Sequence, residues 1–201
     1  MTAPRIDAHQ HFWRYDPAEY DWIDDAMAGL RRDCLPDEAL REMAGAGVDA
    51  CVAVQARQTL DETRWLLALA DAHPAIVGVV GWIDLQAADA RTQLELFADH
   101  RKLVGIRHIV QSEPDDRFML RPAFCRGIAL LEEFGLAYDI LVYSRHLPAA
   151  AELAERFAQP AIRARPSRQA GHSAWRATHV GERAFACSPA VPTCLQSCRD
   201  W

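Results

Sequence analysis

The segment IVGVVGWIDL, residues 76–85, is a continuous run of apolar and β-branched side chains. Such a run is typical of a buried strand in a parallel sheet, whereas a half-exposed strand alternates apolar with polar residues. The segments VDACVAVQA (48–56) and LVGIRHIV (103–110) have the same character. Amphipathic helical patterns at 61–72 and 87–100 separate the three runs. The alternation predicts parallel strands joined by right-handed crossover helices.

The same alternation continues on both sides of this central part. Further strands are expected at 5–9 and 137–143, and further helices at 36–46, 122–134 and 147–157. Five βα units fit either a doubly wound sheet or part of a TIM-type (β/α)8 barrel. The barrel is preferred because polar and ionisable residues gather where the strands end. Residues 1–160 are therefore predicted to be the N-terminal part of such an α/β barrel.

Composition and charge limit the class of protein. The chain is 50% hydrophobic and 25% charged, and its formal net charge of −6 does not favour a nucleic acid or an anionic membrane as a partner. No apolar run reaches the length of a membrane span, and no signal peptide is visible at the N-terminus. The six cysteines form no CxxC pair, so reduced thiols and a cytoplasmic location are expected. The sequence indicates no particular oligomeric state.

The composition changes near residue 160. Residues 162–201 contain six arginines and only two acidic residues, and three of the six cysteines lie in the last 15 residues. A complete α/β barrel usually needs about 250 residues, which is more than the 201 present. We therefore expect residues 161–201 to form an irregular tail instead of a sixth βα unit.

His9 and His11 lie at the end of the first expected strand. Positions i and i+2 of a strand point to the same face, so the two imidazoles can converge on one divalent metal ion, such as zinc, or on one substrate oxygen. Histidines with this spacing also occur as partly packed residues without a role, and that alternative stays open. A place at a strand end favours the functional interpretation, because barrel sites gather there.

Arg107 and His108 are neighbours in the fourth expected strand, so only one of them can easily reach the barrel lumen. Arg107 is suited to bind an anionic or polyol oxygen, and the alternative is a salt bridge on the helix side. Gln55 and Arg57, at the end of the second strand, are similar candidates for substrate contacts.

Asp84 and Asp139 are expected to lie within strands three and five. A carboxylate in a buried strand is unfavourable unless it is paired. Each is therefore expected either to hydrogen-bond to a residue that itself contacts the substrate, or to form a structural bond to a neighbouring histidine or arginine.

Three sequence motifs resemble those of a known family: IDAHQHFW at the first expected strand, GIRHIVQSEPDD at the fourth and GLAYDILVYSRHLP at the fifth. They resemble the amidohydrolase-2 group of the amidohydrolase superfamily. Within it they are most similar to the sugar-lactone hydrolases that open lactones of L-fucose, L-rhamnose or D-galactose. The resemblance covers residues 4 to about 160. It implies a (β/α)8 barrel that hydrolyses a cyclic ester, with His9 and His11 as its first-strand pair and one divalent metal ion in some members.

Members of this group continue with a phrase like FVLDHLAKP and later carry the general base, a strand-eight aspartate, in a phrase like GSDWP. Neither phrase occurs in these 201 residues. Residues 162–170 can be written as codons in which the third base is free to vary. If these codons are then read one base later, they can encode all nine residues of FVLDHLAKP. We interpret the tail as the result of a one-base insertion or deletion near codon 160, which shifts the reading frame. The alternative is that the tail is a genuine, divergent C-terminal extension. We expect the chain to lack the base and to be inactive.

The resemblance predicts a hydrolase whose parent activity is the opening of a sugar lactone, a small molecule, at the C-terminal mouth of the barrel. The predicted substrate contacts are Gln55, Arg57, Arg107 and His108; the predicted metal ligands are His9 and His11; no catalytic residue is identified. The alternatives are a decarboxylase or another C–O or C–N hydrolase of the same superfamily. A non-catalytic α/β protein is the alternative from another class.

Overall fold

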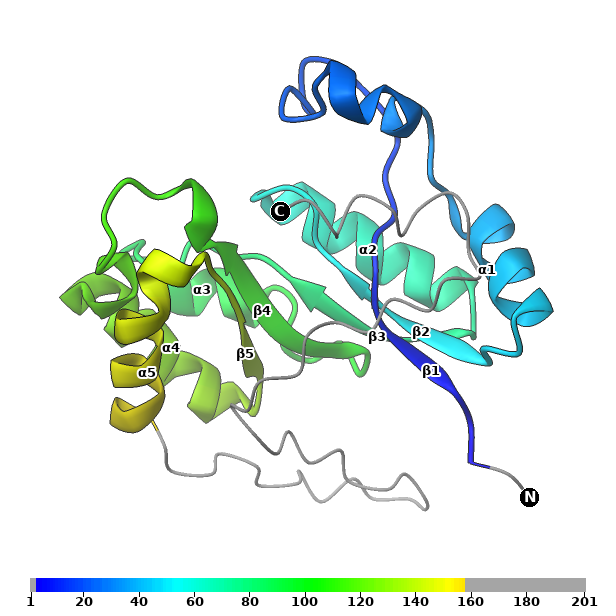
Figure 1. Ribbon diagram of the computed structural model, residues 1–201. Helices are drawn as coiled ribbons and strands as arrows, with labels where there is room; N and C mark the ends of the chain where they lie inside the picture. The colour runs from blue at the N-terminus through cyan, green and yellow to red at the C-terminus, as the bar shows by residue number, and fades with distance from the viewer. Residues whose placement is uncertain (1–2, 158–201) are drawn as a thin grey trace.

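Five parallel strands form one sheet in the computed structural model, which describes residues 3–157. The strands are β1 (Ile6–Gln10), β2 (Ala50–Val54), β3 (Ile76–Gly81), β4 (Leu103–Ile109) and β5 (Ala137–Leu141). Each strand pairs with the next one along the chain. A doubly wound sheet would reverse its strand order at a switch point. The uninterrupted order, in a sheet that curls (Figure 1), confirms the prediction of a partial (β/α)8 barrel. The predicted tail, residues 161–201, lies outside the described residues.

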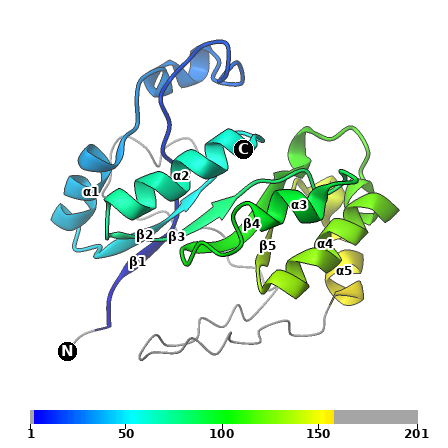
Figure 2. The ribbon, with the colours of Figure 1, turned by 180° about the vertical axis from the view of Figure 1, so that it is seen from behind.

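A helix follows each strand. The helices are α1 (Pro36–Gly45), α2 (Leu60–Ala72), α3 (Ala90–Glu95), α4 (Pro122–Phe134) and α5 (Leu147–Arg156). Short 3-10 helices are η1 (Asp25–Leu30), η2 (Val110–Ser112), η3 (Phe118–Leu120) and η4 (Ser144–His146). Figure 2 shows α1 to α4 in front of the sheet, and Figure 1 shows the opposite face. Within the described part of the chain, no helix is long and apolar enough to cross a bilayer.

The main hydrophobic core lies between the sheet and the helices. On the sheet side it contains Cys51, Ala53, Ile76, Val79, Leu103 and Ile106, all buried. Val77 and Val104, which neighbour core residues along their strands, are 43% and 42% exposed. The two faces of the sheet therefore differ: one is packed against helices, and the other is the lumen side of the curled sheet.

The helix boundaries follow from local sequence signals. Pro122 occupies the first turn of α4, where its missing N–H does not disrupt a helical hydrogen bond. The helix ends at Gly135, whose φ of +66° is a left-handed conformation that glycine adopts without strain. The expected bounds 122–134 are therefore confirmed.

The segment after β3 differs from the sequence expectation. The strand ends at Gly81, before the predicted end at residue 85, and α3 covers only Ala90–Glu95 instead of 87–100. Asp84 is therefore not inside a strand, and that prediction was wrong. Its carboxylate accepts a hydrogen bond from the backbone N–H of Gln86 (2.9 Å), and its carbonyl accepts one from the N–H of Ala87. An aspartate that binds the backbone two residues ahead favours a turn over a strand.

The long connection between β1 and α1 has a small core of its own. This loop cluster consists of Trp13, Tyr20, Ile23, Leu30 and Cys34. Trp13 and Cys34 pair as an isolated antiparallel bridge, which closes the base of the connection. Figure 1 shows the connection at the C-terminal end of β1, the edge of the sheet where the candidate residues lie.

Gly127→Ala tests the packing of α4 against the segment that follows β3. A Cβ atom at Gly127 would lie 2.2 Å from the carbonyl oxygen of Leu85, which is backbone and cannot move aside cheaply. We expect a loss of at least about 2 kcal/mol in the free energy of unfolding. Urea unfolding followed by circular dichroism measures this loss.

Gly45→Ala in α1 is the matched control, because a Cβ there meets nothing within 4 Å. It should stabilise the chain, by up to about 1 kcal/mol. Equal unfolding free energies for the two variants would contradict the described packing of α4.

Candidate active site

Three strand ends bring His9, His11, Gln55 and Arg107 together. The Nε2 atoms of His9 and His11 lie 3.1 Å apart, and Nη1 of Arg107 lies 3.1 Å from Nε2 of His9. Arg107 also donates from Nη2 to the side-chain oxygen of Gln55 at 2.9 Å. The predicted convergence of the two imidazoles, on the side where strands two and four end, is confirmed. We call these four residues the lumen cluster.

The hydrogen bonds determine where the protons of the two imidazoles lie. Nδ1 of His11 is 2.8 Å from the carbonyl oxygen of Val54, which can only accept, so this nitrogen carries the proton. Nε2 of His9 accepts from Arg107, because a guanidinium can only donate. Both Nε2 atoms are therefore unprotonated and lie 3.1 Å apart, and the lone pair of His9 is engaged by Arg107. A metal ion bound by both nitrogens would take the place of the Arg107 hydrogen bond at His9.

This pair fits two of the ligands of a divalent metal ion. Two nitrogens bound to a tetrahedral zinc ion at about 2.0–2.1 Å lie about 3.3 Å apart, close to the 3.1 Å between the Nε2 atoms of His9 and His11. Residues 3–157 contain no group of three or more His, Cys, Asp or Glu side chains arranged to hold a metal. Within residues 3–157, the spacing of His9 and His11 is thus compatible with two ligands of such an ion.

Burial and charge keep both histidines neutral. Burial, with the nearby Arg107 charge as the second cause, lowers the pKa of His9 to about 4. Burial also lowers the pKa of His11 to about 3, with further contributions from Arg107 and His9. Neutral imidazoles can bind a metal ion or accept a proton.

Arg107 and His108 face opposite sides of the sheet, so the expectation that only one of them reaches the lumen is confirmed. Arg107 is only 4% exposed and lies in register with Asp139 of β5. Burial raises the pKa of Asp139, and the charge of Arg107 acts in the opposite direction. Asp139 thus feels the charge of Arg107, and the expectation that it supports the site or bonds to a neighbouring histidine or arginine stays a prediction.

His108 lies on the helix side, away from the lumen cluster. Nε1 of Trp82 donates to its Nδ1 (3.4 Å), its Nε2 lies 2.8 Å from Glu113, and its ring stacks on Phe118. Trp82 fixes the tautomer, so Nε2 donates to the Glu113 carboxylate. These contacts tie the end of β3 to the segment after β4. A substrate contact of His108 stays a prediction.

Arg57 is also separate from the lumen cluster. It forms an ion pair with Glu19, and its guanidinium lies over the ring of Tyr20, 5.4 Å from the centroid. Tyr20 belongs to the loop cluster, so Arg57 connects the end of β2 to the long connection after β1. A substrate contact of Arg57 likewise stays a prediction.

Glu62 is a residue of this region that the sequence reasoning missed. It is buried at the start of α2, and its carboxylate accepts the backbone N–H groups of Ala56 and Arg57. Thr59 caps the same helix by accepting from the N–H of Glu62 at 3.1 Å. Thr followed three residues later by Glu is the capping-box pattern, and this signal could have identified the residue.

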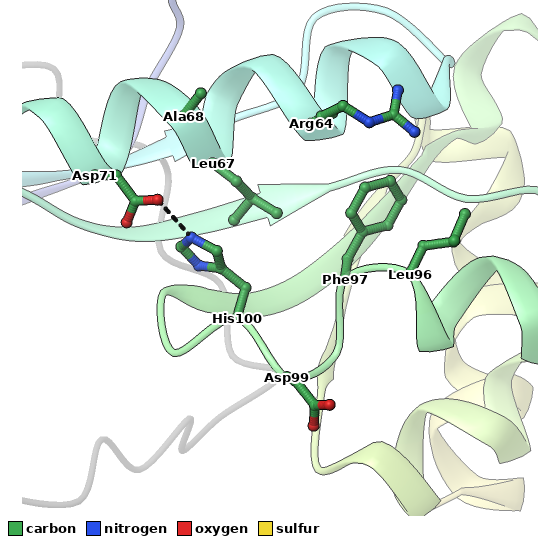
Figure 3. A pocket seen from close by; sticks show the side chains of 8 residues that line it. All are labelled: Arg64, Leu67, Ala68, Asp71, Leu96, Phe97, Asp99 and His100. Atoms are coloured by element: carbon green, nitrogen blue, oxygen red, sulfur yellow. Dashed lines mark hydrogen bonds and ion pairs between the residues drawn. The ribbon is translucent and has the colours of Figure 1, made fainter.

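A hollow of the described residues lies elsewhere, on the helix-covered side. It has a volume of about 390 Å³, and Figure 3 shows it between α2 and the turn that precedes β4. His100 and Asp71 form an ion pair at its edge, with 3.1 Å between Nε2 and the carboxylate. None of the predicted site residues lines it. Its position near the start of β4 is typical of packing and not of a barrel active site.

Comparisons with known proteins agree on one family. A family model described as amidohydrolase matches residues 6–162. A protein of Burkholderia multivorans named L-fucono-1,5-lactonase is 46% identical over 151 residues, which is 74% of this chain and 50% of the relative. A protein of the same name from Burkholderia ambifaria is 35% identical over 194 residues, 93% of this chain and 65% of the relative.

The structural comparison leads to the same group. A solved amidohydrolase from Burkholderia multivorans with bound zinc has a TM-score of 0.73 and 42% identity, over 77% of this chain and 54% of that one. The chain therefore spans between about half and two thirds of the length of the relatives it matches.

The buried carboxyl group of Glu62 should make stability depend on pH. Burial raises its pKa from 4.5 to about 7, so between these values the unfolded chain releases a proton that the folded chain keeps. The contribution of this group is complete below pH 4.5 and is lost as the pH rises to 7. Relative to Glu62→Gln, the wild-type chain should lose roughly 2–3 kcal/mol of unfolding free energy between pH 5 and pH 8.

Urea unfolding of both chains at these two pH values measures the difference. Because the comparison is with Glu62→Gln, titration of all other groups cancels. A difference that is constant with pH, or that grows in favour of the wild type at pH 8, would show that the folded protein holds Glu62 as the carboxylate.

Proposed function

The chain belongs to the amidohydrolase family, and from that premise we propose that its lumen cluster binds and polarises the carbonyl group of a sugar lactone for hydrolysis. The observation that carries the proposal is the convergence of a buried, charged Arg107 with two neutral histidines at the C-terminal ends of the strands. Barrel enzymes place their chemistry at this edge of the sheet. The names of the two Burkholderia relatives support L-fucono-1,5-lactone as the first substrate to test.

Arg107 supplies the positive charge that this reaction needs. When water attacks a lactone carbonyl, negative charge develops on the carbonyl oxygen, and fixed donors in a dry site stabilise that charge. The guanidinium is held by Gln55 and His9 before substrate arrives, so it needs little reorientation. Burial strengthens its field, because little water is present to screen it.

His9 and His11 would hold a divalent metal ion such as zinc, with the metal in place of the Arg107 hydrogen bond at His9; such an ion supplies further polarisation of a carbonyl oxygen when bound. The zinc in the solved relative from Burkholderia multivorans supports this assignment. We also propose that the substrate is a small molecule and that the protein binds neither a nucleic acid nor a membrane. A cytoplasmic location is part of the proposal as well.

Ligand binding tests the role of the lumen cluster. We expect the chain to bind the hydroxy acid formed by opening L-fucono-1,5-lactone. Arg107→Met should weaken that binding at least about tenfold, because a charged hydrogen bond to an oxygen contributes roughly 1.5–3 kcal/mol. Isothermal titration calorimetry measures both affinities. His100→Asn, at the outer hollow, is the control and should bind like the wild type. Equal affinities for wild type and Arg107→Met would contradict the proposal.

Turnover tests the expected lack of a general base. The family's strand-eight aspartate phrase does not occur in these 201 residues. We therefore expect hydrolysis of the lactone by the purified chain to stay well below an ordinary enzyme rate of about 1 s⁻¹ or more. A pH-indicator assay of acid release measures it. An ordinary rate that Arg107→Met abolishes would support the proposed site and overturn the expectation of inactivity.

A further inference from the structure

Gln55 directs both ends of its side chain at one residue. It follows β2 directly and is fully buried. Its Oε1 accepts from Nη2 of Arg107 at 2.9 Å, and its Nε2 donates to the backbone carbonyl of Arg107 at 3.3 Å. The backbone carbonyl of Gln55 accepts from the same Nη2. Arg107 of β4 thus forms three hydrogen bonds with a single residue at the end of β2: it donates two and accepts one.

These bonds determine the orientation of the guanidinium. Arg107 is buried, and a buried charge is unfavourable unless its donors find acceptors. Both oxygens of Gln55 engage Nη2, and this leaves Nη1 directed at Nε2 of His9. If the guanidinium turned about its long axis, Nη2 would lose two acceptors in a site where water cannot replace them.

The end of β2 also fixes the other half of the lumen cluster. The carbonyl of Val54, the residue before Gln55, accepts from Nδ1 of His11 at 2.8 Å. Two consecutive residues therefore orient the arginine of β4 and a histidine after β1. A glutamine suits this place because an amide both donates and accepts while it adds no charge beside the two neutral imidazoles.

We propose that Gln55 is a positioning residue that orients the guanidinium of Arg107 toward His9, and that it does not contact the substrate directly. This positioning role replaces the substrate contact that the sequence predicted for Gln55. The inference rests on the proposed function, since positioning matters for catalysis only if Arg107 polarises the lactone. The orientation of Arg107 itself can be measured without any substrate.

The test is the ¹⁵N–¹H spectrum of the arginine side chains in the full 201-residue chain. A guanidinium held at Nη2 rotates slowly and gives separate Nη signals, whereas a mobile one gives a single averaged signal. Arg107→Lys identifies the signals of Arg107 by their loss. We expect separate, slowly exchanging Nη signals in the wild type. In Gln55→Met, whose side chain has no donor and only a weak acceptor, Nη2 keeps the backbone carbonyl but loses Oε1, so the Nη2 signal should shift and exchange between the Nη signals should become faster.

Gln55→Glu is the rescue variant. Its carboxylate keeps an acceptor for Nη2, so the separate signals should persist and shift downfield, as charge-assisted hydrogen bonds are stronger. Gln58→Met is the matched control, since Gln58 also binds β4 but through the backbone N–H of Ile109 at 2.8 Å. It should leave the Arg107 signals separate.

Either of two results would overturn the proposal. One is a folded Gln55→Met chain in which the Nη signals of Arg107 keep their wild-type positions and exchange rate. The other is a Gln55→Glu spectrum in which the Arg107 signals do not move, which decides the matter even if Gln55→Met fails to fold. Failure of the proposed function is distinguishable, because it would abolish ligand binding by the wild-type chain while the Nη signals still responded to Gln55→Glu and Gln55→Met.

Discussion

The buried guanidinium of Arg107 is the constraint on which the candidate site depends. A charge that is 4% exposed must be matched by acceptors, and those acceptors come from residues far away in the sequence: Gln55 at the end of β2 and His9 in β1. They can meet Arg107 only if β1, β2 and β4 run parallel and end at one edge of the sheet. The strand order, with each strand beside the next along the chain, provides this arrangement.

The same charge shapes the chemistry of its neighbours. Burial disfavours a protonated imidazole, and a guanidinium 3.1 Å from His9 adds electrostatic repulsion, so the pKa values of His9 and His11 fall together. The histidines are thereby held as lone-pair donors, which is the form that a metal ion or a proton requires. Burial, together with this one cation, thus keeps the two histidines neutral.

Adjacent residues of one strand serve different purposes in this fold. Arg107 lies on the lumen face, whereas His108 stacks on Phe118 among the helices and hydrogen bonds to Glu113. The period of two along a strand separates them. The helix face is packed so closely that Gly127 of α4 approaches the carbonyl of Leu85 with no room for a Cβ atom. The lumen face carries the polar cluster, so stability and chemistry are assigned to opposite sides of the sheet.

The sequence by itself determined the number, order and approximate bounds of the strands and helices, because buried parallel strands are continuous apolar runs and helices carry their own caps. It also determined that His9 and His11 converge, since their spacing matches the strand period. It was wrong about Asp84, which closes a turn that the apolar pattern of residues 76–85 conceals. Only the tertiary structure decided that Arg107 joins the histidines while His108 and Arg57 do not, and that Gln55 binds Arg107. Those assignments depend on which face of a strand points inward and on which strand ends become neighbours, and both are fixed when the sheet curls and packs against its helices.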